Sequence, residues 1–303
     1  MPHTARWSLF RALLERFAAT LDAGDLRVLR ALEALRESYE YVPLELLELK
    51  LKMPPSHLSR SLERLVEMRA VRRAEQGVSL TFRGLDALAF LHLKRRGYIA
   101  RLGERIGAGK EGDVFLVELP EGELGVLKLH RGGVRRFRKM RRYRGYAAEL
   151  RGDRLKLAVL TCRREHWALE QLSKRGALVP RPIARSRHAL LQEYIEGVEL
   201  YKLREAGEQE ARELLLTALG TVRKAYLEVA IVHGDLSEYN VLASNGRSYV
   251  IDWPQYLRVG EPGAEEALRG DVERLVRFFS RRFSLDVKAE DALSYVRGIR
   301  GEL

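Results

Sequence analysis

Cysteine is almost absent from this sequence, and long apolar runs are missing altogether. Cys162 is the one cysteine among 303 residues, which excludes an internal disulfide and a zinc site built from several cysteines. No stretch reaches the roughly 18 consecutive apolar residues of a membrane-spanning helix. Residues 1–26 carry charged side chains among the apolar ones and have no small-residue cleavage site, unlike a signal peptide. We therefore expect a cytoplasmic protein with no membrane partner and a buried Cys162.

The charge is strongly one-sided. Lys and Arg number 54 against 42 Asp and Glu, which gives a formal net charge of +12. A basic excess of this size favours a large anionic partner, and nucleic acid is the commonest one in a cytosol. The length allows two domains that fold on packing alone.

Residues 1–94 predict a winged helix-turn-helix domain. The apolar spacing predicts helices over 25–36, 42–51 and 56–68, with Asp25 capping the first. A hairpin over 70–82 and a closing helix over 84–93 follow. Three helices followed by a hairpin is the order of elements in a winged helix.

The helix over 56–68 is the predicted recognition helix. Leu58, Leu62, Leu65 and Val66 form its expected inward stripe. The side chains expected to face a groove or flank the wing are His57, Ser59, Arg60, Arg72 and Arg73. Nucleic-acid contact and docking on protein, or on the neighbouring domain, both remain open for this surface.

A basic run follows in the second domain. Arg131–Arg144 holds eight Arg or Lys residues in fourteen positions, which predicts that it lies outside the core. One interpretation is a solvated insert. The other is a clamp for RNA phosphates, with Phe137 and Tyr143 available to stack on bases.

The first candidate nucleotide-binding motif of residues 95–303 is a glycine-rich turn. Glycines let the backbone approach the phosphates of a nucleotide, and a strand resumes at Val114 where a dinucleotide-binding fold would start a helix. The pattern therefore favours the hairpin of a kinase. The predicted nucleotide-binding residues here are Gly107, Ala108, Gly109, Lys110, Glu111, Gly112, Asp113 and Val114.

Three further segments fit a kinase. Lys128, fourteen residues after Val114, is flanked by apolar strand residues, so its ammonium group needs a partner, and Glu165 on a following helix is the predicted one. The apolar strand over 190–195 would cross between two lobes. Backbone groups of Glu193 and Ile195 are there the candidates to hold adenine.

The strongest motif is His233–Leu242, followed by Val250–Trp253. Asp235 and Asn240 have the spacing of a kinase catalytic loop, in which the aspartate orients the attacking hydroxyl and the asparagine holds a metal ion. Asp252 would complete a magnesium site, since Mg²⁺ takes hard oxygen ligands beside ATP phosphates. The predicted catalytic residues are Asp235, Asp252 and Lys128, and the predicted metal ligands are Asn240 and Asp252.

The motifs GAGKEGDVF (107–115), VLKLHRGG (126–133), HGDLSEYN (233–240) and IDWPQ (251–255) resemble those of the RIO family of atypical kinases, in the branch with an N-terminal winged helix. The resemblance implies an α+β fold in which a winged helix precedes a compact bilobal kinase-like domain. Its N-lobe would cover about 95–193 and its C-lobe about 194–303.

The same resemblance implies an ATP- and Mg²⁺-dependent serine/threonine protein kinase and ATPase that autophosphorylates and acts in maturation of the small ribosomal subunit. Asp252 would be able to take the phosphoryl group. The expected partners are the small-subunit precursor and its rRNA, bound by a monomer through the winged helix and the run Arg131–Arg144.

Two alternatives remain open on the sequence alone. A small-molecule kinase of the aminoglycoside or choline type shares the HGD and IDW motifs. A winged-helix nucleic-acid-binding regulator with a degenerate kinase domain is the other, and magnesium-dependent ATP binding would distinguish it.

Overall fold

The computed structural model describes residues 14–17, 19–109, 112–131 and 153–303. Contacts between Cα atoms divide the chain into two compact units, which are described separately below. Unit 1 contains residues 1–132, 153–159 and 184–191, and unit 2 contains residues 133–152, 160–183 and 192–303. Within the described ranges, no helix combines the length and apolarity needed to cross a membrane.

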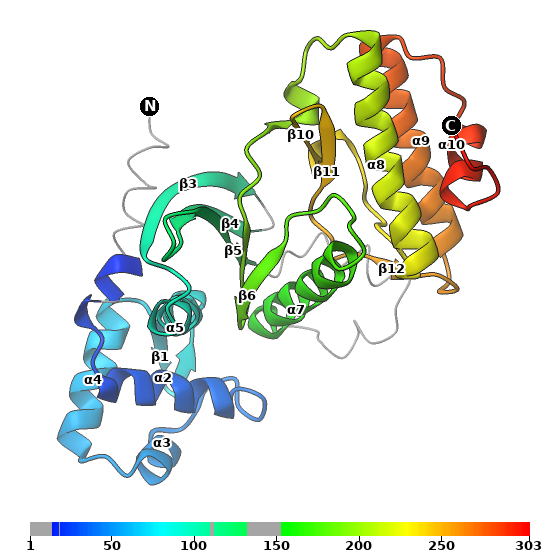
Figure 1. The fold of residues 1–303 in the computed structure, drawn as a ribbon. Helices are drawn as coiled ribbons and strands as arrows, with labels where there is room; N and C mark the ends of the chain where they lie inside the picture. The colour runs from blue at the N-terminus through cyan, green and yellow to red at the C-terminus, as the bar shows by residue number, and fades with distance from the viewer. Residues whose placement is uncertain (1–13, 18, 110–111, 132–152) are drawn as a thin grey trace. The chain divides into compact units, whose positions relative to one another are not determined.

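The winged helix forms the first part of unit 1 (Figure 1). Its elements are α2 (Ala23–Leu35), α3 (Leu44–Leu51), α4 (Pro55–Glu67), β1 (Val71–Ala74), β2 (Gly77–Leu80) and α5 (Phe82–Arg95). The predicted order of three helices, a hairpin and a closing helix is confirmed. The strands β1 and β2 pair antiparallel, with Arg72 opposite Ser79.

Two details of the predicted winged helix were wrong. The cap of α2 is Asp22, whose side chain accepts the Asp25 backbone N–H at 2.8 Å, while the Asp25 carboxylate accepts the Asp22 N–H at 3.1 Å. Helix α2 therefore begins before the predicted cap, and Asp25 lies buried inside it. On α4, Val66 is 38% exposed and does not share the buried stripe of Leu58, Leu62 and Leu65.

A five-stranded sheet follows the winged helix, and most of its residues belong to unit 1. Its strands are β3 (Arg101–Gly109), β4 (Gly112–Glu118), β5 (Leu124–His130), β6 (Pro182–Ser186) and β7 (Ala189–Glu193), in the order β3-β4-β5-β7-β6. In the register of β4 with β5, Phe115 faces Leu127 and Val114 faces Lys128. Because side chains alternate across a strand, the buried Phe115–Leu127 pair and the Val114–Lys128 pair lie on opposite faces.

A buried ion cluster joins the winged helix to this sheet. Arg131, directly after β5, donates to both carboxylate oxygens of Asp86 on α5, at 2.6 and 3.0 Å. It also donates to Asp113 on β4, at 2.9 and 3.1 Å. The His188 ring lies 2.7 Å from Asp86 through Nε2, and both side chains are at most 1% exposed.

This ion cluster corrects the prediction for the first residue of the basic run. Arg131 is an internal counter-ion, so its guanidinium is committed to two carboxylates. The remainder of the predicted RNA clamp, residues 132–144, lies outside the described residues. The predicted domain boundary near residue 95 falls inside unit 1 and stays a prediction.

Unit 2 combines helices with two small sheets. Its main helices are α8 (Glu208–Glu228), α9 (Ala264–Phe283) and α10 (Ala289–Val296), together with most of α7 (Arg154–Ser173). One small sheet has the order β11 (Arg247–Val250), β10 (Val241–Ser244), β8 (Val198–Glu199), and the other pairs β12 (Leu257–Arg258) with β9 (Ile231–Val232).

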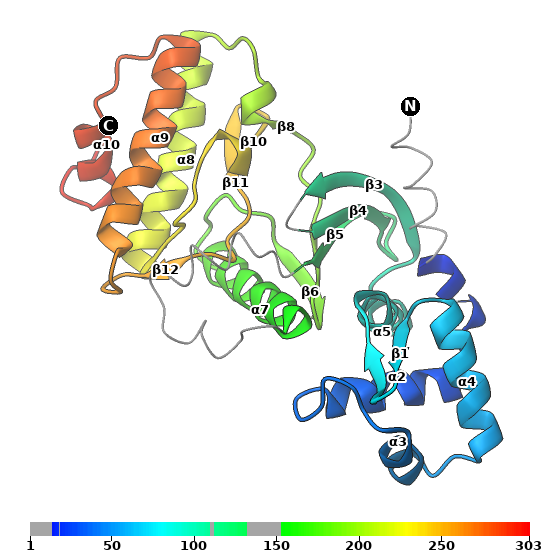
Figure 2. The same cartoon turned by 180° about the vertical axis from the view of Figure 1, so that it is seen from behind.

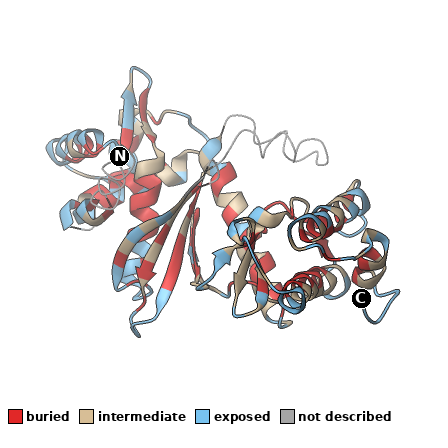
Figure 3. Cartoon of the chain, turned by 90° about the horizontal axis from the view of Figure 1, so that it is seen from above, coloured by how far each residue is buried: buried red, intermediate tan, exposed pale blue. Residues whose placement is uncertain are grey.

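The core of unit 2 lies between its long helices. Helices α8 and α9 run side by side (Figure 2), and their buried residues gather on the faces turned toward the interior (Figure 3). Leu215, Leu219, Leu268 and Leu275 are each at most 1% exposed. Helices and sheets are thus mixed in one chain, as the predicted α+β class requires. Cys162 is also buried, as expected.

Candidate phosphoryl-transfer site

The glycine-rich turn is built as a β3–β4 hairpin. Gly107 pairs with Val114, Ala108 with Asp113, and Gly109 with Gly112. The predicted site residues Lys110 and Glu111 lie outside the described residues. A Cβ atom on Gly112 would come within 2.4 Å of the Leu129 carbonyl oxygen, so the close approach of β5 by itself requires glycine there.

The side chains of Lys128 and Asp113 lie on opposite faces of the sheet. Lys128 lies opposite Val114, on the sheet face away from the buried Phe115–Leu127 pair. Asp113 lies on the other face, where it pairs with Arg105 and Arg131. The two-residue period of the strand turns the Asp113 carboxylate into the ion cluster, and the predicted contact of Asp113 with the nucleotide stays a prediction.

The catalytic loop of unit 2 is held by a residue that sequence reasoning missed. Asp271, buried on α9, accepts the backbone N–H groups of Gly234 at 2.7 Å and Leu236 at 2.9 Å. Arg274 pairs with Asp271 and donates from Nε to the Leu236 carbonyl oxygen at 2.8 Å. Burial raises the pKa of Asp271, against the opposing influence of nearby cations and the two N–H donors.

A signal for Asp271 was present in the sequence. Its position, three residues after Leu268 and four before Leu275, places a carboxylate on the apolar stripe of an amphipathic helix. An inward-facing aspartate at such a position needs donors, and a neighbouring loop can supply them.

The side-chain amide of Asn240 is held in one orientation. Its Nδ2 donates to the Asp235 carbonyl oxygen at 2.8 Å, so the amide oxygen points away from that bond and is the atom available to a cation. The Asn240 carbonyl in turn accepts the Ile251 N–H at 2.9 Å, which ties the catalytic loop to the segment before Asp252. Gln255 approaches the Asp235 carboxylate with Nε2 at a long 3.5 Å.

Asp252 has a left-handed backbone, with φ of +70°. This conformation is costly for a residue with a side chain and persists where neighbours enforce it. On one side His233 Nε2 lies 3.0 Å from the Ile251 carbonyl oxygen. On the other, the fully buried Trp253 donates from Nε1 to the Val250 carbonyl at 3.0 Å, and its ring lies 4.7 Å from that of His233.

Helix α7 secures the segment that follows Asp252. Arg164 donates to the carbonyl oxygens of Pro254 at 3.0 Å and Tyr256 at 2.5 Å, and its guanidinium carbon lies 4.0 Å from the centre of the Tyr256 ring. The backbone on both sides of Asp252 is thus held by hydrogen bonds from side chains. Arg164 was also missed, since nothing in its local sequence distinguishes it from other helix-surface arginines.

The remaining predicted residues fall in separate places. Glu165 lies on α7 at 1% exposure and belongs to unit 2, whereas Lys128 belongs to unit 1, so their pairing stays a prediction. Glu193 donates its N–H to the Arg181 carbonyl at 2.9 Å and accepts the Arg181 N–H on its carboxylate at 3.1 Å. Its carbonyl oxygen is therefore the Glu193 backbone group to consider for adenine, with Ile195 nearby in sequence.

The donor set fits magnesium bound together with ATP. In the described part of the chain, no group of three or more His, Cys, Asp or Glu side chains could hold a metal ion alone. Mg²⁺ beside a nucleotide keeps waters and needs one or two protein oxygens besides those of the phosphates. The Asn240 amide oxygen and the Asp252 carboxylate are hard donors of that kind.

A basic hollow of about 450 Å³ lies beside the catalytic loop in unit 2. Its walls combine arginines and aromatic rings; the lining residues are Tyr201, Glu238, Tyr239, Arg274, Arg277, Phe278, Arg281 and Arg282. The rings of Tyr201 and Tyr239 lie 4.8 Å apart, and Tyr239 is 60% exposed. Guanidinium groups beside exposed rings suit a chain of phosphates and bases, or an acidic segment, better than a basic peptide.

Two family models match the chain. The RIO domain covers residues 113–292, and the Rio2 N-terminal domain covers residues 18–96. The RIO-type serine/threonine-protein kinase Rio2 of Methanocaldococcus jannaschii is 36% identical over 257 residues, which are 83% of this chain and 94% of that protein. The serine/threonine-protein kinase rio2 of Schizosaccharomyces pombe is 29% identical, covering 87% of this chain and 77% of its own length.

Solved structures agree. The Rio2 kinase of Chaetomium thermophilum superposes with a TM-score of 0.75 at 28% identity, covering 93% of this chain and 91% of that one. Its ADP/Mg²⁺-phosphoaspartate complex gives a TM-score of 0.74 at 26% identity, covering 94% and 93%. This chain belongs to the RIO family of serine/threonine-protein kinases, in the branch with a Rio2-type N-terminal winged helix, and uses ATP and Mg²⁺.

Proposed function

We propose that this kinase turns over ATP through a phosphorylated Asp252 and does so during maturation of the small ribosomal subunit. The observation that carries the first part is the fixed, left-handed Asp252 beside the oriented Asn240. The solved phosphoaspartate complex of the Chaetomium thermophilum Rio2 kinase supports it.

The predicted nucleotide-binding residues keep their roles in this proposal. Gly107–Gly112 would offer backbone groups to the phosphates, Lys128 would neutralise them, and Glu165 remains the predicted partner of Lys128. The Glu193 carbonyl and the Ile195 N–H would hold adenine. Asn240 and Asp252 would hold Mg²⁺, which when bound neutralises phosphate charge.

The transfer needs no proton to be removed from its acceptor if that acceptor is Asp252. One carboxylate oxygen forms a bond to the γ-phosphorus, the bond from that phosphorus to the β–γ bridging oxygen breaks, and ADP leaves with the electron pair. Hydrolysis of the resulting acyl phosphate requires water to lose a proton, and Asp235 is the proposed base for that step. A serine hydroxyl acceptor would need Asp235 already in the first step.

Labelling with γ-phosphate-labelled ATP tests this order of events. Wild-type protein should carry a hydroxylamine-sensitive label that Asp252→Asn abolishes together with steady-state ATP turnover. Asp235→Asn should instead accumulate the label, because hydrolysis slows by about 10²-fold or more while the first transfer continues. Asp286→Asn, which removes an exposed carboxylate elsewhere in unit 2, is the matched control. Undiminished ATP turnover in Asp252→Asn would refute the proposal.

The ribosomal part rests on charge and exposure. The α4 positions His57, Ser59 and Arg60 are exposed, as are Arg72 and Arg73 on β1. Together with the basic hollow beside the catalytic loop, they favour small-subunit precursor and its rRNA as partners of a cytoplasmic monomer.

Co-sedimentation with small-subunit precursors, comparing ATP with a non-hydrolysable analogue, tests that partner. We expect retention with the analogue and release with ATP. Sedimentation away from the precursors in both conditions would refute the ribosomal role while leaving the Asp252 chemistry intact. The small-molecule kinase alternative has no observation in its favour once the Rio2-type N-terminal domain is matched.

A further inference from the structure

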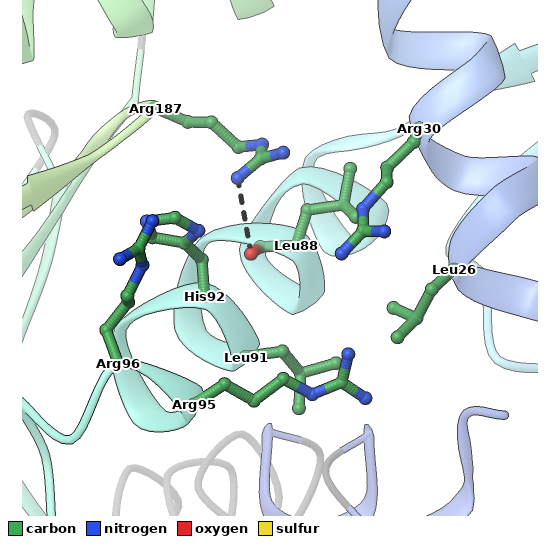
Figure 4. Close-up of a pocket in the computed structure, with 8 residues that line it drawn as sticks. All are labelled: Leu26, Arg30, Leu88, Leu91, His92, Arg95, Arg96 and Arg187. Atoms are coloured by element: carbon green, nitrogen blue, oxygen red, sulfur yellow. Dashed lines mark hydrogen bonds between the residues drawn. The ribbon is translucent and has the colours of Figure 1, made fainter. Parts of the chain in front are cut away.

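A second basic hollow lies in unit 1, away from the recognition helix α4. It has a volume of about 250 Å³ and is lined by Leu26, Arg30, Leu88, Leu91, His92, Arg95, Arg96 and Arg187. Figure 4 shows Arg30 from α2 and Arg95 from α5 extending toward the same space beside Leu26 and Leu91. Its walls therefore come from two helices and from the turn between β6 and β7.

One of the four arginines is neutralised. Arg187 forms a two-pronged pair with Glu33, from Nε at 2.6 Å and from Nη2 at 2.8 Å, and its Nη1 reaches the Leu88 carbonyl at 3.4 Å. Among the described residues, the guanidinium groups of Arg30, Arg95 and Arg96 have no hydrogen-bond or ion-pair partner. Three donor groups of one sign thus line a small space, and the lining itself contains no Asp or Glu.

The pKa of His92 reflects the positive charge around the hollow. Its pKa lies below the ordinary histidine value, first because of burial and then because of Arg187, Arg96 and Arg30. A neutral imidazole at pH 7 leaves the arginines as the source of charge and adds one N–H donor. The last turn of α5 exposes carbonyl oxygens that favour cations, which accounts for some of this clustering but not for Arg30 and Arg187 on other elements.

We propose that this hollow binds the phosphodiester backbone of RNA. Guanidinium groups match phosphate oxygens with paired N–H donors. The apolar floor of Leu26, Leu88 and Leu91 suits a sugar, and the lining has no Phe, Tyr or Trp on which a base would stack. The volume is also small for a whole nucleotide cofactor. The site therefore positions RNA without reading its sequence.

The inference depends on the proposed function in taking RNA as partner, and it adds a contact on α2 and α5 to the expected one on α4. The test measures binding of a mixed-sequence single-stranded RNA to the full chain over a range of salt concentrations. Arg30→Gln/Arg95→Gln should weaken binding at least about tenfold and reduce the slope against log salt by about one. Arg30→Lys/Arg95→Lys should retain most of the slope.

Lys94→Gln is the control for non-specific charge, since it removes one positive charge from the turn of α5 that holds Arg95 without lining the hollow. ATP turnover without RNA should be unchanged in all variants. If wild-type protein binds RNA and the double Gln variant behaves as Lys94→Gln does, this site falls while the proposed function stands. If wild-type protein binds no RNA, both fall. Tight binding of tripolyphosphate that only the hollow variants lose, with RNA binding unchanged, would assign the site to a small anion and overturn the proposal.

Discussion

Replacing Asp86 with alanine should destabilise unit 1 far more than removing an exposed ion pair from the same sheet. Asp86 is 1% exposed and holds Arg131 through two oxygens, while Arg131 is itself 17% exposed. Loss of one partner from a buried pair leaves an uncompensated charge and typically costs about 3 to 5 kcal/mol. Because Asp113 still accepts two bonds from Arg131, we expect the lower end, about 3 kcal/mol.

The matched control is Glu118→Ala. Glu118 pairs with Arg101 at 2.8 Å, but the two side chains are 37% and 73% exposed, so its removal should cost under about 1 kcal/mol. By thermal unfolding followed with circular dichroism, Asp86→Ala should lower the transition of unit 1 by roughly 6 to 12 °C. Glu118→Ala should lower it by no more than about 4 °C.

A double-mutant cycle then separates the pair from its surroundings. Asp86→Ala/Arg131→Ala should cost less than the sum of the two single changes, by about 1 to 3 kcal/mol, since the double variant leaves neither charge stranded opposite the other. Equal shifts for Asp86→Ala and Glu118→Ala, or additive single effects, would refute the ion cluster as a determinant of stability.

Three further predictions concern Asp271, Gly112 and His188. Asp271→Asn should reduce kcat by about tenfold or more with little change in the KM for ATP, because Gly234 and Leu236 lose a charged acceptor while the nucleotide groups stay intact; a changed KM alone would argue against it. Gly112→Ala should weaken ATP binding in a calorimetric titration, because its Cβ would meet the Leu129 carbonyl at 2.4 Å and displace β4; unchanged binding would contradict this. Burial lowers the pKa of His188, so its stabilising contribution is complete above about pH 6.5 and is lost as the pH falls below that value. The free energy of unfolding, measured by urea titration, should therefore fall less between about pH 7.5 and 5.5 in His188→Gln than in the wild-type protein. An equal fall in both proteins would refute this cause.

Features encoded by short-range patterns could be predicted from the sequence. The helices of the winged domain and the β1–β2 hairpin follow from apolar periodicity and glycine placement. The spacing of a motif selects Asp235, Asn240 and Asp252 as candidate site residues, and their roles stay predictions. In each case the determining residues lie within a few tens of positions of one another.

Features made by distant residues could not be predicted. Asp86 and His188 are 102 positions apart in the sequence, and Asp86 and Arg131 are 45 apart. No local sequence pattern therefore predicts their contacts. Arg131 was expected outside the core, in a solvated insert or an RNA clamp, because its neighbours in sequence are basic, while its neighbours in space are the carboxylates of Asp86 and Asp113. The side of β4 on which Asp113 lies depended on the register with β5, which composition does not fix.

The ion cluster of Asp86, Arg131, Asp113 and His188 also limits where the chain can be truncated and how its domains can evolve. A fragment beginning at residue 95 would keep Arg131 and Asp113 but lose Asp86, and would expose the sheet face on which Asp113 lies. The N-terminal winged domain is thus not an exchangeable attachment. A different adaptor could replace it only by supplying a carboxylate at the same place, so helix α5 and the strand after the glycine turn should change together over evolution.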